Sequence, residues 1–314
     1  PDGVLTDALA ELPFFARETP VAVQTWLETE AMIMLQKNPV WIRTGFTALD
    51  RALDGGFQPG QLVTVAARTG VGKTVFAEQL AQAASRQGKV LMFSLEMEMN
   101  QLMRRFLARE AGVAHSVVRQ GWGRMPPEDR VRLEEAIAKP GQAGDTSEAL
   151  SIVTSERFLS VENVRLQCMN AATRGPIAMV VVDHLGLLEC RRNSPSESET
   201  AVIKRQVEQL RALARVLDCV VVITAQLNRN AVTKKQRPTL AHLRGSDAIG
   251  HTADIVLLIY NEKADFRSEG DDPLDREEVE LIVDKNRDGA RAIVPMLWEG
   301  GFVRFVDPSM RTWS

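Results

Sequence analysis

Cysteine and histidine are scarce in this chain, and their scarcity argues against two kinds of protein. The three cysteines, Cys168, Cys190 and Cys219, are scattered, and none lies in a Cys-x-x-Cys pair, so the sequence predicts no disulfide framework. Such cysteine usage is typical of the reducing cytoplasm. The four histidines show no metal-ligand spacing, which argues against a zinc site.

Long apolar runs and an excess of one charge are also missing. Apolar runs are as short as that at residues 177–182, which predicts no membrane span, and no basic-then-apolar leader opens the chain. The net charge is −3, so any binding to nucleic acid must come from a local basic patch. With 314 residues, 45% of them hydrophobic, the chain is long enough for one large globular domain or two small ones.

Segments typical of strands and helices alternate from about residue 60 onward. The predicted strands are Leu62–Ala67, Lys89–Ser94, Ala178–Asp183 and Val220–Ala225. The predicted helices between them are Thr74–Gln87, Asn100–Ala111 and residues 203–217. Later strands are expected at Asp254–Tyr260 and Val279–Asp284, then a hairpin of Arg291–Leu297 and Phe302–Val306, with polar connectors at 139–150 and 191–200. This alternation favours an α/β fold, a mostly parallel sheet with helices on both faces.

The strongest chemical signal is a phosphate loop, residues 67–74. It reads Ala67-Arg68-Thr69-Gly70-Val71-Gly72-Lys73-Thr74, follows an apolar strand and opens a helix. The glycines let the backbone approach phosphate oxygens, Lys73 would reach the β- and γ-phosphates, and the Thr74 hydroxyl would bind Mg²⁺. These residues predict ATP and Mg²⁺ as ligands, although Ala67 replaces the first glycine of the usual motif. A strand-to-helix turn without a ligand is the simpler alternative.

Three further polar residues follow predicted strands. Asp183 ends a strand at the edge where α/β sheets bind ligands, so it is the expected metal-site acid, with a helix cap as the alternative. Glu96 is the expected carboxylate that orients the attacking water, and Glu98 is its competitor. Gln226 is expected to contact the γ-phosphate, or else to close a turn. His184 is interpreted as a structural polar residue.

Six segments in this order resemble one known family. They read ARTGVGKT, FSLEM, VVVDHLGLL, AQLNR, LRGSDAIGHTADIVLLIY and DKNRDG. They resemble the C-terminal ATPase domain of DnaB-type replicative helicases over roughly residues 41–306. The resemblance implies a RecA-like P-loop NTPase core, hexameric rings on single-stranded DNA, and catalytic, metal-site and sensor roles for Glu96, Asp183 and Gln226.

Lys285 and Arg287, here called the cationic pair, lie two residues apart at a predicted strand end. Both side chains can therefore leave the strand on one face. In the resembled helicases this pair enters the neighbouring subunit's site and contacts its γ-phosphate, which a planar guanidinium suits. The resemblance thus implies an active site that two subunits share. A basic surface at a strand end is the alternative.

A local positive block occupies residues 228–251. Its cations are Arg229, Lys234, Lys235, Arg237 and Arg244, with no acid before Asp247. The resemblance implies that this loop, with Gly245, faces the ring channel and grips the DNA backbone. Asp247 stands where the family has no acid, and a carboxylate faces phosphate poorly. The block has no aromatic residue, so we expect salt-sensitive backbone binding without base stacking. A solvated loop is the alternative.

The residues before the phosphate loop complete the predicted organisation. Residues 1–20 are expected to be a weakly ordered extension with a short helix, 21–39 a linker helix that packs on an adjacent subunit or on its own domain, and 40–314 the ATPase domain. Twenty residues are too few for the family's primase-interacting domain, and the chain opens with Pro1. We therefore expect a truncated chain or a shortened helicase of a phage or mobile element.

The predicted function is an ATP-dependent DNA helicase, a ring-forming motor at the replication fork. Its expected partners are single-stranded DNA, further copies of the chain, a primase and a helicase loader, and its expected location is the cytoplasm. A RecA/RadA-type recombination or repair ATPase that separates no strands is the alternative. An ATPase that binds no DNA is a third interpretation, which the basic block disfavours.

Overall fold

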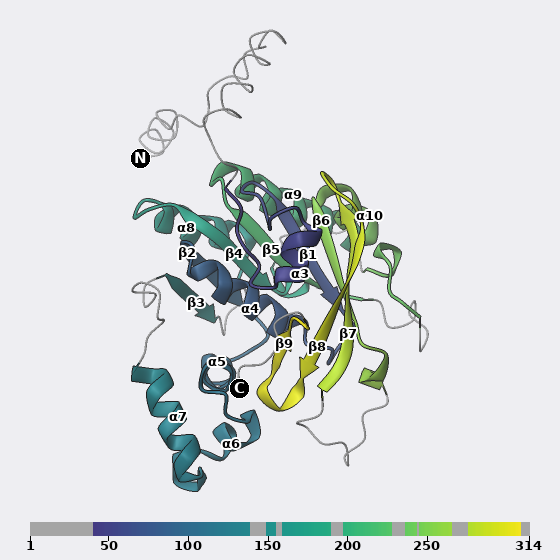
Figure 1. Ribbon diagram of the computed structural model, residues 1–314. Coiled ribbons are helices and arrows are strands. Elements are labelled where there is room, and N and C mark those ends of the chain that lie inside the picture. The colour runs from purple at the N-terminus through teal and green to yellow at the C-terminus, as the bar shows by residue number, and fades with distance from the viewer. Residues whose placement is uncertain are drawn as a thin grey trace. The chain divides into compact units, whose positions relative to one another are not determined.

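The computed structural model describes residues 40–138, 149–154, 159–189, 197–227, 236–243, 245–265 and 276–308 (Figure 1). Internal contacts divide the chain into two units, Pro1–Val40 and Trp41–Ser314, and the described elements belong to the second. The predicted extension 1–20 and linker helix 21–39 lie outside the described residues. Among the described helices, none combines the length and apolar character that crossing a bilayer requires.

A single mixed sheet forms the centre of this second unit. Its strands are β1 (Leu62–Ala67), β2 (Lys89–Ser94), β3 (Leu150–Thr154), β4 (Ile177–Asp183), β5 (Val220–Gln226), β6 (Ile255–Tyr260), β7 (Arg276–Asn286), β8 (Ala292–Glu299) and β9 (Arg304–Val306). Their order across the sheet is β3-β2-β4-β5-β1-β6-β7-β8-β9. The first six in this order pair in parallel, and β7, β8 and β9 continue the sheet antiparallel.

Helices cover both faces of the sheet. The α-helices are α3 (Thr47–Ala52), α4 (Lys73–Ser85), α5 (Met99–Ala111), α6 (His115–Gln120), α7 (Pro127–Ala138), α8 (Val161–Ala172), α9 (Glu199–Val216) and α10 (Ser246–Thr252). Short 3₁₀ turns lie at Trp122–Arg124, Leu185–Leu187, Leu240–His242, Glu262–Asp265 and Gly300–Phe302. Helices α5, α6 and α7 form a separate small group beside the sheet (Figure 1).

The alternation of side chains along the central strands divides the core into two layers. In β1, Val63 and Val65 pack with α3 and α4, whereas Leu62 and Ala66 pack with α8, α9 and α10. Strands buried on both faces are almost wholly apolar, as β1 and β4 are, because helices cover both sides. The predicted mostly parallel sheet with helices on both faces is confirmed.

The structure corrects several predicted elements. Strand β3 begins inside the expected connector 139–150; it is an edge strand of only partly buried residues, so it lacks a strong apolar signal. Helices α6, α7 and α8 are additions to the predicted elements. The hairpin is confirmed, but the 3₁₀ turn Gly300–Phe302 delays its second strand to Arg304–Val306.

Candidate active site

The carboxyl ends of four parallel strands meet at one edge of the sheet. The register places Ala67 of β1 beside Gln226 of β5, and Ser94 of β2 beside Asp183 of β4. Residues that follow these strands are therefore neighbours, although the sequence separates them widely. The predicted phosphate loop, water-orienting acid, metal-site acid and sensor all lie along this edge.

The phosphate loop turns directly from β1 into α4. Gly70 and Gly72 have φ angles of +83° and +101°, which glycine adopts without strain. No side chain caps the amino terminus of α4, so its first N–H groups remain available to a ligand. Within the described residues the Lys73 ammonium makes no ion pair. An uncapped helix start beside a lysine suits a phosphate group.

Asp183 is fully buried at the end of β4. Its Oδ1 accepts a hydrogen bond from the Thr224 hydroxyl at 2.5 Å, while its Oδ2 has no partner among the described residues. A buried carboxylate oxygen without a partner is costly unless a ligand satisfies it. No cluster of three or more possible metal ligands occurs in the described part of the chain. The donor set of Asp183 and the Thr74 hydroxyl therefore fits Mg²⁺, which binds few protein groups and keeps its waters.

Glu96 lies just beyond β2 with half of its side chain exposed, free to face a ligand. Its Oε2 is 4.0 Å from the Nε2 of His184. The His184 Nδ1 accepts the Gly186 N–H at 3.1 Å, and burial and the charge of Lys73 lower the pKa of His184. Its neutral form therefore carries a proton on Nε2, toward Glu96. Glu98, the competitor, directly precedes α5 and is also exposed.

Gln226 connects the end of β5 with the phosphate loop. Its Nε2 donates a hydrogen bond to the Thr69 hydroxyl at 2.5 Å. A ligand in the loop would compete for either group. The contact therefore gives Gln226 a direct path to respond to the occupant of the loop.

The cationic pair lies at the opposite edge of the sheet. Strand β7 runs antiparallel, so Lys285 pairs with Val256 near the start of β6. The Lys285 ammonium donates to the carbonyls of Gly250 and Ala253, and Arg287 forms an ion pair with Asp254 at 3.1 Å. Within one chain the pair is thus turned away from the phosphate loop.

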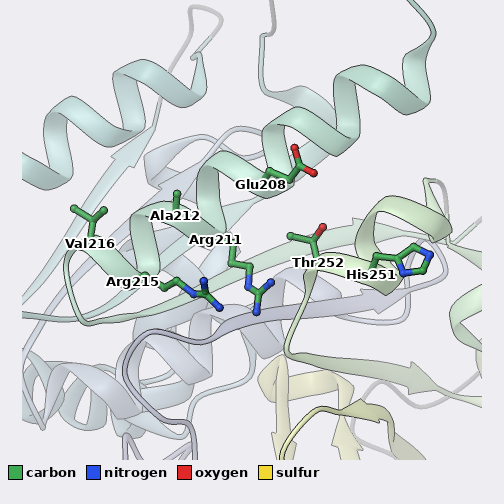
Figure 2. A pocket seen from close by; sticks show the side chains of 7 residues that line it. All are labelled: Glu208, Arg211, Ala212, Arg215, Val216, His251 and Thr252. Atoms are coloured by element: carbon green, nitrogen blue, oxygen red, sulfur yellow. The ribbon is translucent and has the colours of Figure 1, made fainter. Parts of the chain in front are cut away.

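An open pocket of about 400 Å³ lies next to this edge, between α9 and α10. Figure 2 shows Arg211 and Arg215 extending from α9 on the same side as Thr252 and His251 of α10. The His251 carbonyl also accepts a hydrogen bond from Arg287. The pocket therefore adjoins the place where the cationic pair rests.

The predicted DNA-binding block is only partly described. Arg229, Lys234, Lys235 and Arg244 lie outside the described residues. Arg237 forms two hydrogen bonds with the Glu280 carboxylate, at 2.6 and 2.7 Å, so its charge is already paired. Gly245 precedes α10 with a φ of +72°, and a Cβ there would lie 2.8 Å from Ile203. This glycine has a packing reason that involves no DNA.

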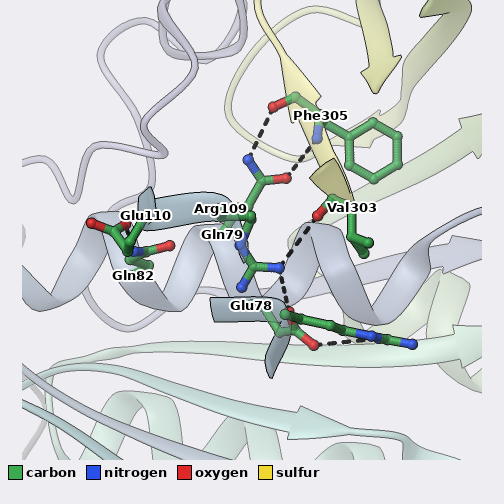
Figure 3. A network of polar contacts seen from close by, with 8 residues as sticks. Glu78, Gln79, Gln82, Arg109, Glu110, Val303 and Phe305 are labelled. Carbon is green, nitrogen blue, oxygen red and sulfur yellow. Dashed lines mark hydrogen bonds and ion pairs between the residues drawn. The ribbon is translucent and has the colours of Figure 1, made fainter. Parts of the chain in front are cut away.

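Buried polar contacts hold α4 and its phosphate loop in place (Figure 3). Glu78 of α4 is fully buried and forms an ion pair with Arg109 of α5 at 2.6 Å; burial raises the pKa of Glu78, and Arg109 opposes this. Gln79 exchanges two hydrogen bonds with the backbone of Phe305 in β9. Helix α4 is thus fixed to the helix that follows Glu96 and to the hairpin.

Comparison with known proteins decides the family. The family model for the DnaB-like helicase C-terminal domain matches residues 41–307. The chain belongs to this family. It is 31% identical over 296 residues to the replicative DNA helicase DnaB of Geobacillus stearothermophilus, and 30% identical over 301 residues to the replicative DNA helicase DnaC of Bacillus subtilis. Each alignment covers 93% of this chain but 62% of the relative, so the chain spans less than two-thirds of their length.

Solved structures share the fold. One of them, an isolated ATPase domain, matches with a TM-score of 0.79 and 26% identity, over 92% of this chain and 99% of that one. A DnaB-like replicative helicase, described with its interactions with primase, matches with a TM-score of 0.77 and 26% identity, over 96% of this chain and 70% of that one. The family resemblance predicted from the six segments is confirmed.

Sequence reasoning missed two residues that contact the cationic pair of this DnaB-like domain or its partner. In the sequence, Asp254 is visible only as the start of a strand, and Arg211 only as a charged residue of a helix. A signal existed for Asp254, since an acid directly before the wholly apolar β6 needs a partner. No local signal could have assigned Arg211 to it, because 43 residues separate them.

Proposed function

We propose that this chain is the motor of an ATP-dependent DNA helicase, which hydrolyses ATP between subunits of a ring and moves along single-stranded DNA. Family membership favours this function over the recombination ATPase. The observation that carries the proposal is the division of the site within one chain: the phosphate loop, Glu96 and Asp183 lie at one edge of the sheet and the cationic pair at the other.

The distance between the two edges gives the physical reason for a shared site. Asp254, which holds Arg287, receives a hydrogen bond from the N–H of Leu62 at the beginning of β1. The phosphate loop follows Ala67 at the end of β1, five residues later. At about 3.3 Å per residue, the strand separates the two by about 17 Å. Arg287 therefore cannot serve its own phosphate loop, and an adjacent copy is the remaining candidate.

Each residue of the phosphate edge has a proposed task. The N–H groups at the start of α4 and Lys73 would bind the phosphates, while Asp183 and Thr74 would hold Mg²⁺, which supplies charge neutralisation when bound. Glu96 would orient the attacking water and accept its proton, with His184 beside it. Gln226 would exchange Thr69 for the γ-phosphate and report its loss to the positive block that follows β5.

The outer parts of the protein are assigned by the same proposal. The linker helix 21–39 would join adjacent subunits and 40–314 would form the ATPase domain, with a hexamer as the assembly. The positive block, without Arg237 while it is paired with Glu280, would bind the DNA backbone. A primase is a proposed partner, because the solved relative is described with one; a helicase loader is a further one.

The test is unwinding of a forked duplex by the full chain with ATP and Mg²⁺. Wild type is expected to release the labelled strand, and Lys73→Ala is expected to abolish both unwinding and ATP hydrolysis, because the phosphates lose their cation. Lys89→Ala is the control, since Lys89 lies at the amino end of β2 and donates to the Ala171 carbonyl, away from the loop. ATP hydrolysis on DNA without strand release would favour the recombination ATPase; full hydrolysis by Lys73→Ala would refute the phosphate loop.

A further inference from the structure

The cationic pair has two members that are held differently. The Lys285 ammonium is partly buried and spends two of its three donors on the carbonyls of Gly250 and Ala253. The Arg287 side chain is 39% exposed and rests on Asp254 and the His251 carbonyl. Arg287 is therefore the member that can leave its place with less loss.

Asp254 is a nearly buried carboxylate with a fixed position. Its side chain is 7% exposed, and its Oδ2 accepts the Leu62 N–H at 3.0 Å. Its Oδ1 receives two guanidinium groups, Arg211 at 2.8 Å from α9 and Arg287 at 3.1 Å from the end of β7. One oxygen thus binds a permanent cation and an exposed one.

This double pairing decides whether Arg287 can move. If Arg287 were the only partner of Asp254, its departure would leave a carboxylate out of water without a counter-ion, which is among the most unfavourable changes in a folded protein. Arg211 prevents this, because its side chain is only 18% exposed and stays on the same oxygen. The nearby positive charges also repel one another: burial, and then the charge of Arg287, lower the pKa of Lys285. Release of Arg287 relieves that repulsion.

We propose that Arg211 is a positioning residue: it is the resident counter-ion of Asp254 that allows Arg287 to detach and reach the nucleotide of an adjacent subunit. This inference rests on the proposed function, in which Arg287 acts across a subunit boundary. The pocket beside Arg211 leaves this side of Arg287 accessible to a second copy (Figure 2). Without Arg211, the buried carboxylate would retain Arg287 in its own chain.

The first experiment measures ATP hydrolysis by the full chain with single-stranded DNA. Arg211→Met keeps the length of the side chain and removes its charge, so kcat is expected to fall about tenfold or more while KM for ATP stays within about twofold. Arg211→Lys should recover part of the rate. Arg215→Met is the matched control: it lies in the same pocket, one helical turn away, and makes no ion pair with Asp254 among the described residues.

The second experiment asks which subunit carries the defect. Arg211→Met is mixed with Glu96→Gln, whose own site is inactive but whose Arg287 is free to move. Mixed assemblies should exceed the summed rates of the two variants, because an intact Arg211→Met site then meets a mobile Arg287. Mixing Arg211→Met with Arg287→Ala should give no gain, since neither donates a working arginine. The double change Asp254→Asn with Arg211→Met should restore the rate, because Arg287 no longer has a charge to hold it.

The outcomes separate the inference from the function beneath it. An inactive Arg287→Ala with a fully active Arg211→Met would overturn the inference alone. The same conclusion would follow if Glu96→Gln rescued Arg287→Ala but not Arg211→Met, or if Asp254→Asn restored nothing. A fully active Arg287→Ala would refute the shared site itself. Should Arg211→Met fail to fold, Arg211→Lys and Asp254→Asn alone decide: the first should reduce kcat at constant KM, and the second should leave it unchanged or raised.

Discussion

Substitution of Gly72 by alanine should disturb the phosphate loop from behind. Gly72 has a φ of +101°, and a Cβ there would lie 2.9 Å from Cζ of Phe305 and 3.2 Å from Trp298. Phe305 is buried, with its ring edge-on to Phe76 at 5.6 Å and tilted against Trp298 at 4.8 Å. The ring is therefore confined by α4 on one side and the hairpin on the other, and it cannot move aside freely.

Two effects add at this position. The left-handed backbone costs an alanine about 1–2 kcal/mol. Overpacking against a confined ring costs about 1–3 kcal/mol more. The sum is about 2–5 kcal/mol, and at about 2 °C per kcal/mol for a domain of this size the melting temperature should fall by about 4–10 °C. The loop that binds phosphate would shift as well, so nucleotide affinity should decrease.

Gly60→Ala is the control that isolates the backbone effect. Its φ is +83°, and a Cβ there would meet nothing within 4 Å. Calorimetric melting of both variants should show a fall of about 2–4 °C for Gly60→Ala and the larger fall for Gly72→Ala. Equal melting temperatures would mean that Phe305 does not pack against the loop, and that the hairpin does not support it.

Two further predictions concern the acids and the thiols. Glu96→Gln should bind ATP normally but lose turnover by about 100-fold or more, whereas Glu98→Gln should stay near wild type in steady-state hydrolysis; the reverse order would exchange their tasks. Burial raises the pKa of Cys168 and Cys219 to about 12, so at pH 8 about one thiol in ten thousand is the reactive thiolate. In a Cys190→Ser background, a chromogenic disulfide should therefore label no thiol in the native protein and two in denaturant, and native labelling would contradict their burial.

The parts of the structure that the sequence predicted are those with local causes. Strand β1 has the predicted bounds Leu62–Ala67, because six apolar or small residues end in a glycine-rich turn. The edge that gathers Asp183 and Gln226 also followed from local patterns, since strand ends in a parallel sheet share an edge. Each of these features needed only a few neighbouring residues to be visible.

The parts that could not be predicted depend on contacts between distant segments. Phe305 packs behind Gly72 only because β9 closes the far end of the sheet, and nothing in residues 67–74 indicates this partner. The pairing of Arg211 with Asp254 joins α9 to the start of β6, two surfaces that separately read as a charged helix face and a strand end. Strand β3 was missed for another reason: an edge strand needs less apolar character than a central one.

The antiparallel direction of β7 gives the cationic pair its meaning. Had β7 run parallel to β6, its carboxyl end would have lain beside the phosphate loop, and Lys285 and Arg287 could have served their own chain. Because it runs antiparallel, its end pairs with the beginning of β6. The same reversal brings Arg287 to Asp254, which is held at the beginning of β1. A single choice of strand direction thus removes the pair from its own site, provides a carboxylate on which it rests, and leaves it exposed for an adjacent copy.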